Sequence, residues 1–374
     1  MTIYGIGRAI VDYYVKGRID ESFMEQAFGQ LPEGSLPSPT GRPIHVEGAA
    51  FSFILNQIST LDGYKLIRET GGTCVNILKT IGTLTPQSTC FFTGTVGQKD
   101  GHLQPVADHE GSFFRSQLES RGIHHQLRVL PGSTGRCLVL PEPGQGWLAL
   151  ASPAVATAIE PEQVRTFLQA VHNTKQTSPA FILVEGMELE KQWLCHQLSS
   201  SPLPLVLACG TPFGARMTVQ FLQEQFQQQS SSGHSQPQER SFVPLVLAND
   251  VEARILEQGN IDFAEWSRNY NILFVITHGA SGSSCYFQGT RLFTPATQVA
   301  PEQIVDATGA GDTFAGAFLS QLAQDILPDN MNQEKILAAM EYASTAASKI
   351  IQVPLCQTAQ LCQTNVLSQE DNEN

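Results

Sequence analysis

Short apolar runs alternate with longer amphipathic segments through most of the chain. Several runs are continuously apolar between Gly, Asn or Pro residues, which is typical of strands buried on both faces. We predict strands at Ile3–Ile6, Cys90–Val96, Phe181–Val184, Leu205–Ala208, Leu245–Ala248 and Leu273–Thr277. We predict helices at Thr73–Ile81, Gly111–Arg121, Pro161–His172, Glu188–Leu198, Ala215–Gln227, Thr313–Ala323 and Glu334–Ile350. This alternation predicts an α/β fold of three layers (α/β/α), with a mostly parallel sheet between two layers of helices.

One segment interrupts the alternation. Arg136–Ala151 contains two apolar stretches around a loop rich in proline and glycine, with no helical pattern between them. Two strands joined in this way form an antiparallel hairpin, which in an α/β protein usually projects from the main sheet. The hairpin could cover a binding site as a small β lid, or it could be a plain surface ribbon.

Two polar segments show neither pattern. Residues 227–241 read QQQSSSGHSQPQERS, and residues 364–374 are polar and acidic. Because the alternation resumes after the first segment, we expect a flexible polar insert there, and we expect a disordered tail in the second. The rest is predicted to form a single domain over residues 1–363, without internal repeats.

Composition and charge exclude several classes of function. Hydrophobic residues make up 41% of the 374 residues, enough for a large core, and the formal net charge is −13. Such an acidic chain is poorly suited to coating nucleic acid or an anionic membrane. No apolar run approaches the roughly 18 to 20 residues of a membrane span, and the first residues lack the pattern of a secretory signal. We therefore expect a soluble, cytoplasmic protein with no nucleic-acid or membrane partner.

The eight cysteines form no recognisable metal or redox motif. None belongs to a C-x-x-C pair, and most lie in apolar runs, where a free thiol packs as a small core residue. The adjacent residues His124 and His125 could bind a metal, but a solvated loop or helix end is the simpler interpretation.

The segment Asp306–Phe314, DATGAGDTF, carries the sharpest chemical signal. Gly309, Ala310 and Gly311 are small enough to let backbone N–H groups approach a ligand, and a helical pattern follows directly. The unpaired N–H groups and the positive dipole end of that helix would then form an anion hole for a phosphate-like group. The spacing matches neither the P-loop nor the dinucleotide-binding motif.

Asp312 stands at the entrance of this helix, and two roles are open for it. Asp is a good N-terminal cap, and glycine-rich turns between strand and helix are common. A carboxylate inside an anion-binding turn can also accept the proton of an attacking hydroxyl, while the helix end stabilises charge on a phosphoryl group. Because capping alone does not explain a carboxylate inside an anion-binding turn, we expect Asp312 to be a general base.

DATGAGDTF resembles the C-terminal signature of the ribokinase or phosphofructokinase-B (PfkB) family of carbohydrate and nucleoside kinases. Further segments resemble motifs of this family in the same order along the chain. They are Gly5–Asp12, Gly71–Asn76, Val96–Gly97 with Asp108–Gly111, Thr134–Cys137, Asn249–Glu252 and Thr277–Gly282. Each segment is a weak signal alone, but the occurrence of all of them in the family's order by chance is improbable. The long helical segment before Gly71 leans the resemblance toward the adenosine-kinase-like branch.

The resemblance implies an enzyme that uses ATP and Mg²⁺ to phosphorylate a hydroxyl, typically a primary CH₂OH, of a sugar or nucleoside. It implies lid elements near residues 12–20 and 134–151, and it leaves a homodimer through the lid open. The residues implied to bind the acceptor are Asp12, Gly71, Gly72 and Asn76. Those implied to bind the nucleotide are Thr277, Gly279 and Gly282. In part of the family a monovalent cation such as K⁺ is bound, which here would involve Asp306 and Thr308.

Asn249 and Glu252 have two interpretations. At i and i+3 after a predicted strand, they fit a capping box, in which each side chain bonds to the backbone of the other residue. Spacing alone favours this cap. The resemblance implies instead that they hold Mg²⁺ through water beside the phosphates, which suits the oxygen ligands and retained hydration of this ion.

Arg8 departs from the family pattern, which often has Asn at this place. Its guanidinium could bind an anionic group of the substrate or pair with an acid such as Asp12. If it blocks the pocket, the chain would be a ribokinase-like binding or regulatory protein without turnover. A nucleotide-binding structural subunit has no sequence feature in its support, and the intact Asp312 with its Gly-Ala-Gly segment favours the enzyme.

Overall fold

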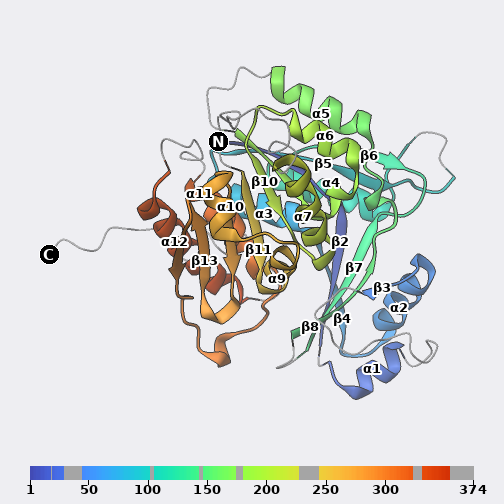
Figure 1. The fold of residues 1–374 in the computed structure, drawn as a ribbon. Helices are drawn as coiled ribbons and strands as arrows, with labels where there is room; N and C mark the ends of the chain where they lie inside the picture. The colour runs from blue at the N-terminus through green and yellow to red at the C-terminus, as the bar shows by residue number, and fades with distance from the viewer. Residues whose placement is uncertain are drawn as a thin grey trace.

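The computed structural model describes residues 1–17, 19–28, 44–101, 105–142, 146–173, 180–226, 244–322 and 331–353. The predicted polar insert at 227–241 and the predicted tail at 364–374 lie outside the described residues. Within the described part, two sheets and their helices form the fold (Figure 1).

The larger sheet has nine strands. In spatial order they are β14 (Thr290–Thr294), β13 (Ser283–Phe287), β12 (Leu273–Thr277), β11 (Leu245–Asn249), β10 (Leu205–Ala208), β9 (Ala180–Glu185), β1 (Thr2–Ile6), β5 (Thr89–Gly97) and β6 (His124–Leu130). Neighbours from β12 to β6 pair in parallel, whereas β13 and β14 are antiparallel. All six predicted strands are confirmed, each to within one residue at either end, and so is the mostly parallel sheet.

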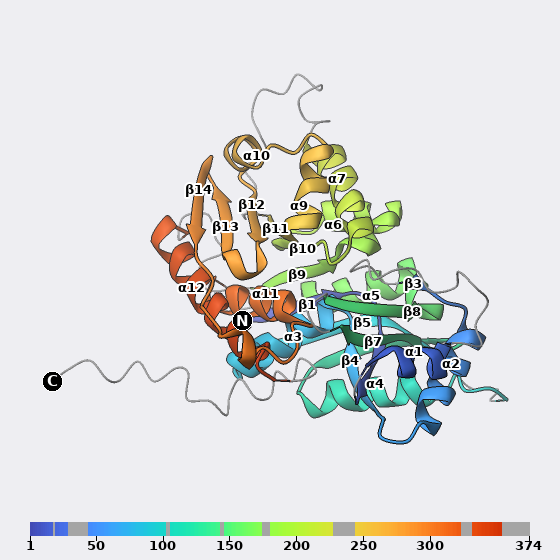
Figure 2. The same cartoon turned by 90° about the horizontal axis from the view of Figure 1, so that it is seen from below.

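Two layers of helices cover this sheet, one on each face (Figures 1 and 2). Along β9, Phe181 and Leu183 belong to one hydrophobic core and Ile182 and Val184 to the other, because successive side chains of a strand point to opposite faces. The first core includes α3 (Thr73–Leu84), α4 (His109–Ser120), α11 (Ala310–Leu322) and α12 (Gln333–Ile350). The second includes α5 (Pro161–Asn173), α6 (Gln192–Ser199), α7 (Pro212–Phe226), α9 (Asp250–Gln258) and α10 (Phe263–Asn269). The predicted three-layer fold is confirmed.

The predicted helix Glu188–Leu198 is wrong at its start. The structure has a 3₁₀ helix over Gly186–Glu190, and α6 begins only at Gln192. The extended backbone of Lys191, with ψ of 100°, separates the two. Glu188 is charged and yet fully buried, so burial in this turn does not follow the apolar pattern from which the helix was predicted.

The smaller sheet was only partly predicted. It contains β3 (Ile44–His45), β8 (Gly146–Ser152), β7 (Gly135–Glu142), β2 (Ile10–Lys16) and β4 (Lys65–Gly71), in that order. β7 and β8 form the predicted hairpin. Leu138 and Leu150 pack with the helices α1 (Glu21–Phe28) and α2 (Gly48–Thr60), which lie against one face of this sheet (Figure 2). Alternate side chains, such as Val139 and Ala149, line a cavity on the other face.

Asp12 lies in the second strand and not at the end of the first. The chain leaves β1 at Ile6, crosses from the larger to the smaller sheet within three residues, and re-enters a strand at Ile10. Asp12 therefore lies inside β2, opposite Glu69 of β4. The predicted lid element near 12–20 overlaps this strand, which ends at Lys16, and its role as a lid stays a prediction.

The segments Val96–Gly97 and Asp108–Gly111, which together resemble one motif of the family, meet in the fold. Asp108 Oδ1 accepts hydrogen bonds from the N–H of Gly111, at 2.7 Å, and from the Thr134 hydroxyl, at 2.6 Å. Its Oδ2 accepts one from the Thr134 N–H, and Gly97 N–H donates to the Thr134 hydroxyl oxygen. Between the two segments, Gln98 and Ala107 pair as an isolated antiparallel β-bridge. Asp108 thus fixes the start of β7.

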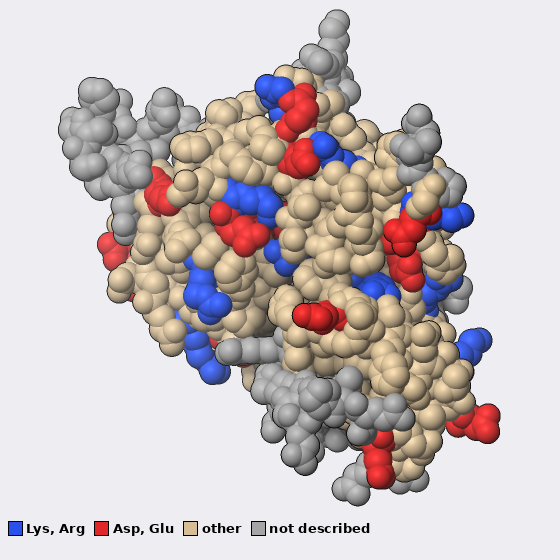
Figure 3. Space-filling view, turned by 90° about the vertical axis from the view of Figure 1, so that its right-hand side faces the viewer, with Lys and Arg blue, Asp and Glu red and all other residues tan. Residues whose placement is uncertain are grey.

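Two observations concern the expectations about membranes and nucleic acid. Among the described helices, none is both long and apolar enough to cross a membrane. On the face drawn in Figure 3, basic and acidic side chains of the described residues are scattered among one another and form no continuous basic area.

The expectation that His124 and His125 lie in a loop or at a helix end is wrong, since both lie in the edge strand β6.

Candidate active site

Three cavities lie at the carboxyl edge of the larger sheet and meet at the start of α11. The large cavity, of about 730 Å³, lies between the two sheets. The central cavity, of about 120 Å³, lies beside the ends of β10, β11 and β12. The outer cavity, of about 340 Å³, lies between the loop after β12 and α12. Asp312 lines both the large and the central cavity, and Gly311 lines both the central and the outer one.

Asp312 and Asn76 are brought together by close packing of α11 against α3. A Cβ on Gly316 would lie 2.6 Å from Cβ of Thr80 and 2.8 Å from the Ile77 carbonyl oxygen, so only glycine allows this approach. One turn toward the start of α11, Asn76 Nδ2 donates a hydrogen bond to Asp312 Oδ2 at 2.8 Å. Two predicted site residues separated by 236 positions are therefore in direct contact.

The environment of Asp312 shifts its proton affinity upward. Burial raises the pKa of Asp312 to about 6, while the hydrogen bond from Asn76 and the positive charge of Lys79 act in the opposite direction. A carboxylate with a pKa just below neutral is ionised at pH 7 and can still accept a proton readily. This balance suits a general base.

The first turn of α11 contains the predicted anion hole. Gly309 has a left-handed backbone, with φ of 76°, and α11 begins at Ala310, three residues earlier than predicted. The N–H of Ala310 donates to the Ala307 carbonyl oxygen, and that of Thr313 donates to Gly309. The Thr313 bond is the first regular bond of the helix, so the four N–H groups that the helix leaves unpaired are those of residues 309–312. Since Ala310 is engaged in the turn, the N–H groups of Gly309, Gly311 and Asp312 remain for a ligand. The predicted anion hole therefore has fewer donors than expected, because the Ala310 N–H cannot donate to an anion while it keeps its bond to Ala307.

Asp12 lies against the end of β4. A Cβ on Gly71 would lie 2.0 Å from Asp12 Oδ2, so the carboxylate occupies the space that a side chain at 71 would need. Burial raises the pKa of Asp12 to about 7, Lys79 lowers it, and Asp312 and Glu69 raise it further. The buried Lys79 donates from Nζ to the Thr70 carbonyl oxygen at 2.7 Å and so ties α3 to the strand that carries Gly71.

Glu185 is a candidate site residue that the sequence reasoning missed. It ends β9, is 1% exposed and lines the large cavity. Its two carboxylate oxygens accept hydrogen bonds from the N–H groups of Cys74, at 2.9 Å, and Arg8, at 3.3 Å. Burial raises its pKa to about 7. An acidic residue directly after the apolar run Phe181–Val184 was the available signal, because open sheets bind ligands beyond the carboxyl ends of their strands.

Arg8 pairs with acids other than Asp12. Its Nε lies 2.9 Å from Glu188 Oε1, and its guanidinium reaches Glu190 at 3.8 Å. Lys191 also contacts Glu188, at 3.0 Å. Arg8 forms part of the wall of the large cavity and leaves the cavity open. Arg8 thus pairs with an acid, as one of the two alternatives held, but the acid is Glu188 and not Asp12.

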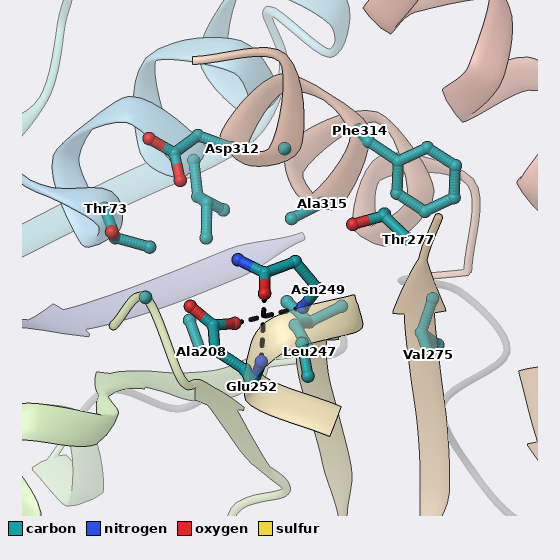
Figure 4. Close-up of a pocket in the computed structure, with 14 residues that line it drawn as sticks. Thr73, Ala208, Leu247, Asn249, Glu252, Val275, Thr277, Asp312, Phe314 and Ala315 are labelled. Atoms are coloured by element: carbon teal, nitrogen blue, oxygen red, sulfur yellow. Dashed lines mark hydrogen bonds between the residues drawn. The ribbon is translucent and has the colours of Figure 1, made fainter. Parts of the chain in front are cut away.

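Asn249 and Glu252 form the capping box of α9 and also line the central cavity (Figure 4). Asn249 Oδ1 accepts hydrogen bonds from the N–H groups of Val251 and Glu252, and Glu252 Oε2 accepts one from the Asn249 N–H. Burial raises the pKa of Glu252 to about 7. Since the box engages only one carboxylate oxygen of Glu252, capping leaves the other oxygen for a hydrated cation.

The remaining predicted residues lie along the outer and large cavities. Thr277, Gly279 and Gly282 line the outer cavity. Thr308 lines the large cavity, and its N–H donates to Asp306 Oδ1 at 2.8 Å, which closes a local turn. Within the described residues no cluster of three or more His, Cys, Asp or Glu side chains could hold a metal by itself.

Comparisons with known proteins agree with this architecture. Residues 239–362 match the model of the pfkB family carbohydrate kinase. A stretch of 86 residues, 22% of this chain and 27% of the relative, is 42% identical to a cytidine kinase of Thermococcus kodakarensis. A stretch of 120 residues, 30% of this chain and 36% of the relative, is 30% identical to a ribokinase of Staphylococcus aureus.

These alignments span about a quarter to a third of the curated relatives that the chain matches. The likeness in structure is broader. The crystal structure of adenosine kinase from Sinorhizobium meliloti superposes with a TM-score of 0.68 at 19% identity, covering 96% of this chain and 98% of that one. The predicted resemblance is therefore confirmed: residues 239–362 match the model of the pfkB family carbohydrate kinase, and the chain has the same fold as the adenosine kinase from Sinorhizobium meliloti.

Proposed function

We propose that the protein is a kinase that transfers the γ-phosphoryl group of ATP to a hydroxyl group of a sugar or nucleoside. The observation that carries this proposal is the place of Asp312. Its carboxylate borders the large and central cavities, in the first turn of a helix whose free N–H groups attract an anion. An acceptor in the large cavity and a phosphate chain in the central cavity would meet at this carboxylate.

In this mechanism Asp312 accepts the proton of the acceptor hydroxyl as the oxygen attacks the γ-phosphorus. Asn76 holds Oδ2 by its hydrogen bond, so that the other oxygen, Oδ1, takes the proton. The N–H groups of Gly311 and Asp312 stabilise the charge on the transferred group. Asp12 and Glu185, with Gly72, are proposed to hold the other hydroxyls of the acceptor.

Mg²⁺ fits the central cavity as a partly hydrated ion. Asn249 and Glu252 supply oxygens from one side, and their engagement in the capping box leaves too few free ligands for a dry site. Mg²⁺ usually keeps several waters and binds one or two carboxylates together with substrate phosphates. When bound, it would neutralise phosphate charge during transfer. The role of Asp306 and Thr308 with K⁺ stays a prediction, as does a homodimer through the lid.

The walls of the large cavity favour an acceptor with an apolar part. Ile10, Val139 and Ala149 line it from the smaller sheet, and the exposed ring of Phe213 lines it from the start of α7. The carboxylates of Asp12, Glu185 and Asp312 line the same cavity. A nucleoside has an apolar base and a polar sugar in this arrangement, whereas a free sugar would leave the apolar wall in water. We therefore favour a nucleoside.

The second candidate, a binding or regulatory protein without turnover, loses its main argument. It required Arg8 to block the pocket, but Arg8 is held in the wall by Glu188 and a cavity of about 730 Å³ remains.

The test is ATP consumption across a panel of nucleosides and sugars, with Asp312→Asn beside the wild type. The variant keeps the size of the side chain and should lower turnover by about a thousandfold or more while ATP binding changes only a few-fold. Near wild-type turnover in the variant would refute the assignment. Binding of acceptor and ATP without any turnover in the wild type would support the regulatory alternative.

A further inference from the structure

A chain of hydrogen bonds that involves none of the proposed catalytic residues joins the side chains of Asp250, His278, Ser284 and Arg291. His278 Nδ1 lies 2.5 Å from Asp250 Oδ1, and His278 Nε2 lies 2.8 Å from Ser284 Oγ. The same Ser284 oxygen accepts hydrogen bonds from Arg291 Nε, at 3.1 Å, and from its terminal nitrogen, at 2.9 Å. Ser284 is fully buried, and the His278 side chain is only 20% exposed.

The geometry assigns a direction to every bond in this chain. Arg291 can only donate, and its two bonds occupy the two lone pairs of the Ser284 oxygen. Ser284 must therefore donate its proton to His278 Nε2, which acts as an acceptor. The remaining ring proton lies on Nδ1 and is donated to the Asp250 carboxylate. The imidazole is therefore held at both nitrogens in one orientation.

The chain does not have the properties of a hydrolytic triad, although it contains Ser, His and Asp. The Ser284 oxygen is inaccessible to solvent, and its lone pairs are already engaged by Arg291. A nucleophile needs a free lone pair aimed at a substrate. The arrangement is therefore suited to holding its members in place.

His278 connects two elements of the proposed nucleotide site. It lies between Thr277 and Gly279 in the loop that lines the outer cavity, and its N–H donates to the Gly282 carbonyl oxygen at 2.8 Å, which closes that loop. Asp250, its partner, is the first residue of α9 and directly follows Asn249 of the central cavity. The ring thus ties the loop of one cavity to the helix of the next.

We propose that His278, held by Asp250 and Ser284, is a positioning residue that fixes the loop 277–282 relative to α9 and thereby sets the affinity for ATP. This inference rests on the proposed kinase function. A nucleotide that spans the two cavities needs their spacing to be fixed before it binds, because a loop that must be ordered on binding lowers affinity. The loop does not line the large cavity, which is the proposed acceptor site.

The decisive variants are His278→Ala and Ser284→Ala. Each removes at least one bond of the chain, and we expect the Kd and KM for ATP to rise about tenfold in His278→Ala and less in Ser284→Ala, the size expected for lost hydrogen bonds to or within a charged network. The KM for the acceptor should stay within about twofold. Asp250→Asn keeps an oxygen that accepts from Nδ1 and should retain most of the ATP affinity.

His125→Ala is the matched control. His125 also pairs with a carboxylate, Glu119, at 3.1 Å, and its side chain is 17% exposed, but it lies in the edge strand β6, and neither residue lines any of the three cavities. This variant should lose about as much thermal stability as His278→Ala with no change in ATP affinity. A rise in Kd for ATP that is confined to the His278 and Ser284 variants supports the proposal.

Two results would overturn it. One is unchanged ATP binding in folded His278→Ala; the other is an equal loss of affinity for ATP and acceptor, which would indicate general destabilisation. If His278→Ala does not fold, Ser284→Ala and Asp250→Asn decide by the same readouts. Direct titration with MgATP separates the two proposals: a wild type that binds no ATP refutes the kinase function, whereas equal binding by wild type and variants refutes only the positioning role.

Discussion

Replacing Gly71 by alanine offers a test of the acceptor site that depends on one contact. Gly71 ends β4 and its backbone is not left-handed, so alanine is compatible with the main chain. A Cβ at this position would lie 2.0 Å from Asp12 Oδ2 and 2.4 Å from Oδ1, whereas such atoms keep at least 3.0 Å apart. The Asp12 carboxylate must therefore move by about 1 Å.

A displacement of about 1 Å of a positioned group can lower the rate by about a hundredfold, which corresponds to about 2.7 kcal/mol. We expect kcat/KM for the acceptor to fall by this factor in Gly71→Ala, measured at saturating ATP. ATP affinity, measured by direct titration, should change by less than about threefold, because Gly71 lines neither the central nor the outer cavity.

Gly82→Ala is the control for this variant. Gly82 lies in α3, and a Cβ there meets no atom within 4 Å, so alanine should leave activity unchanged and stabilise the helix by about 0.5–1 kcal/mol. If Gly71→Ala keeps kcat/KM within about threefold of wild type, the Asp12 carboxylate does not contact the acceptor in the way proposed. A parallel loss of ATP affinity would instead indicate misfolding and also contradict the reasoning.

Three further predictions concern stability and the walls of the large cavity. Burial raises the pKa of the carboxyl groups of Asp12, Glu185, Glu252 and Asp312, so their contribution to stability is fully present below about pH 4 and is lost as pH rises through about 6 to 7, by about 1.4 kcal/mol per pKa unit. The melting temperature of the ligand-free protein should therefore fall between about pH 4 and pH 7, and less steeply in Asp12→Asn. Arg8→Met should lower the free energy of unfolding by about 2 kcal/mol in denaturant titration, since Lys191 still pairs with Glu188, and should leave the acceptor KM unchanged; a tenfold rise in that KM would instead make Arg8 an acceptor contact. Phe213→Ala should raise KM about tenfold for nucleosides and leave it unchanged for free sugars, if the ring stacks on a base; equal effects on both would count against a nucleoside acceptor.

The sequence predicted the larger sheet well because its central strands are buried on both faces. A continuous apolar run such as Phe181–Val184 has few alternatives to a buried strand. The strands of the smaller sheet were harder to find, since β4 reads KLIRETG and is only partly buried over most of its length. No apolar run marks such a strand, and its pairing with β2 depends on a crossing between sheets that periodicity does not reveal.

The candidate site was predictable in its residues but not in its contacts. DATGAGDTF located Asp312 and the turn before it, and the resemblance located Asp12 and Asn76. The hydrogen bond from Asn76 to Asp312 depends on how closely α3 and α11 approach, and this distance is set by Gly316, which carries no chemical signal of its own. Glu185 was missed for a related reason, because one acidic residue after an apolar run is also what the end of any strand looks like.

The narrow central cavity has a consequence for inhibitor design. The large and outer cavities share no lining residue, whereas the central cavity of about 120 Å³ shares Asp312 with the large one and Gly311 with the outer one. A bisubstrate compound that joins an acceptor mimic to adenosine would have to place its linker in this small central cavity. Chain length and linker width, more than the chemistry of either end, would then decide whether such a compound binds, and a series of phosphate-chain lengths would measure the spacing of the two sites directly.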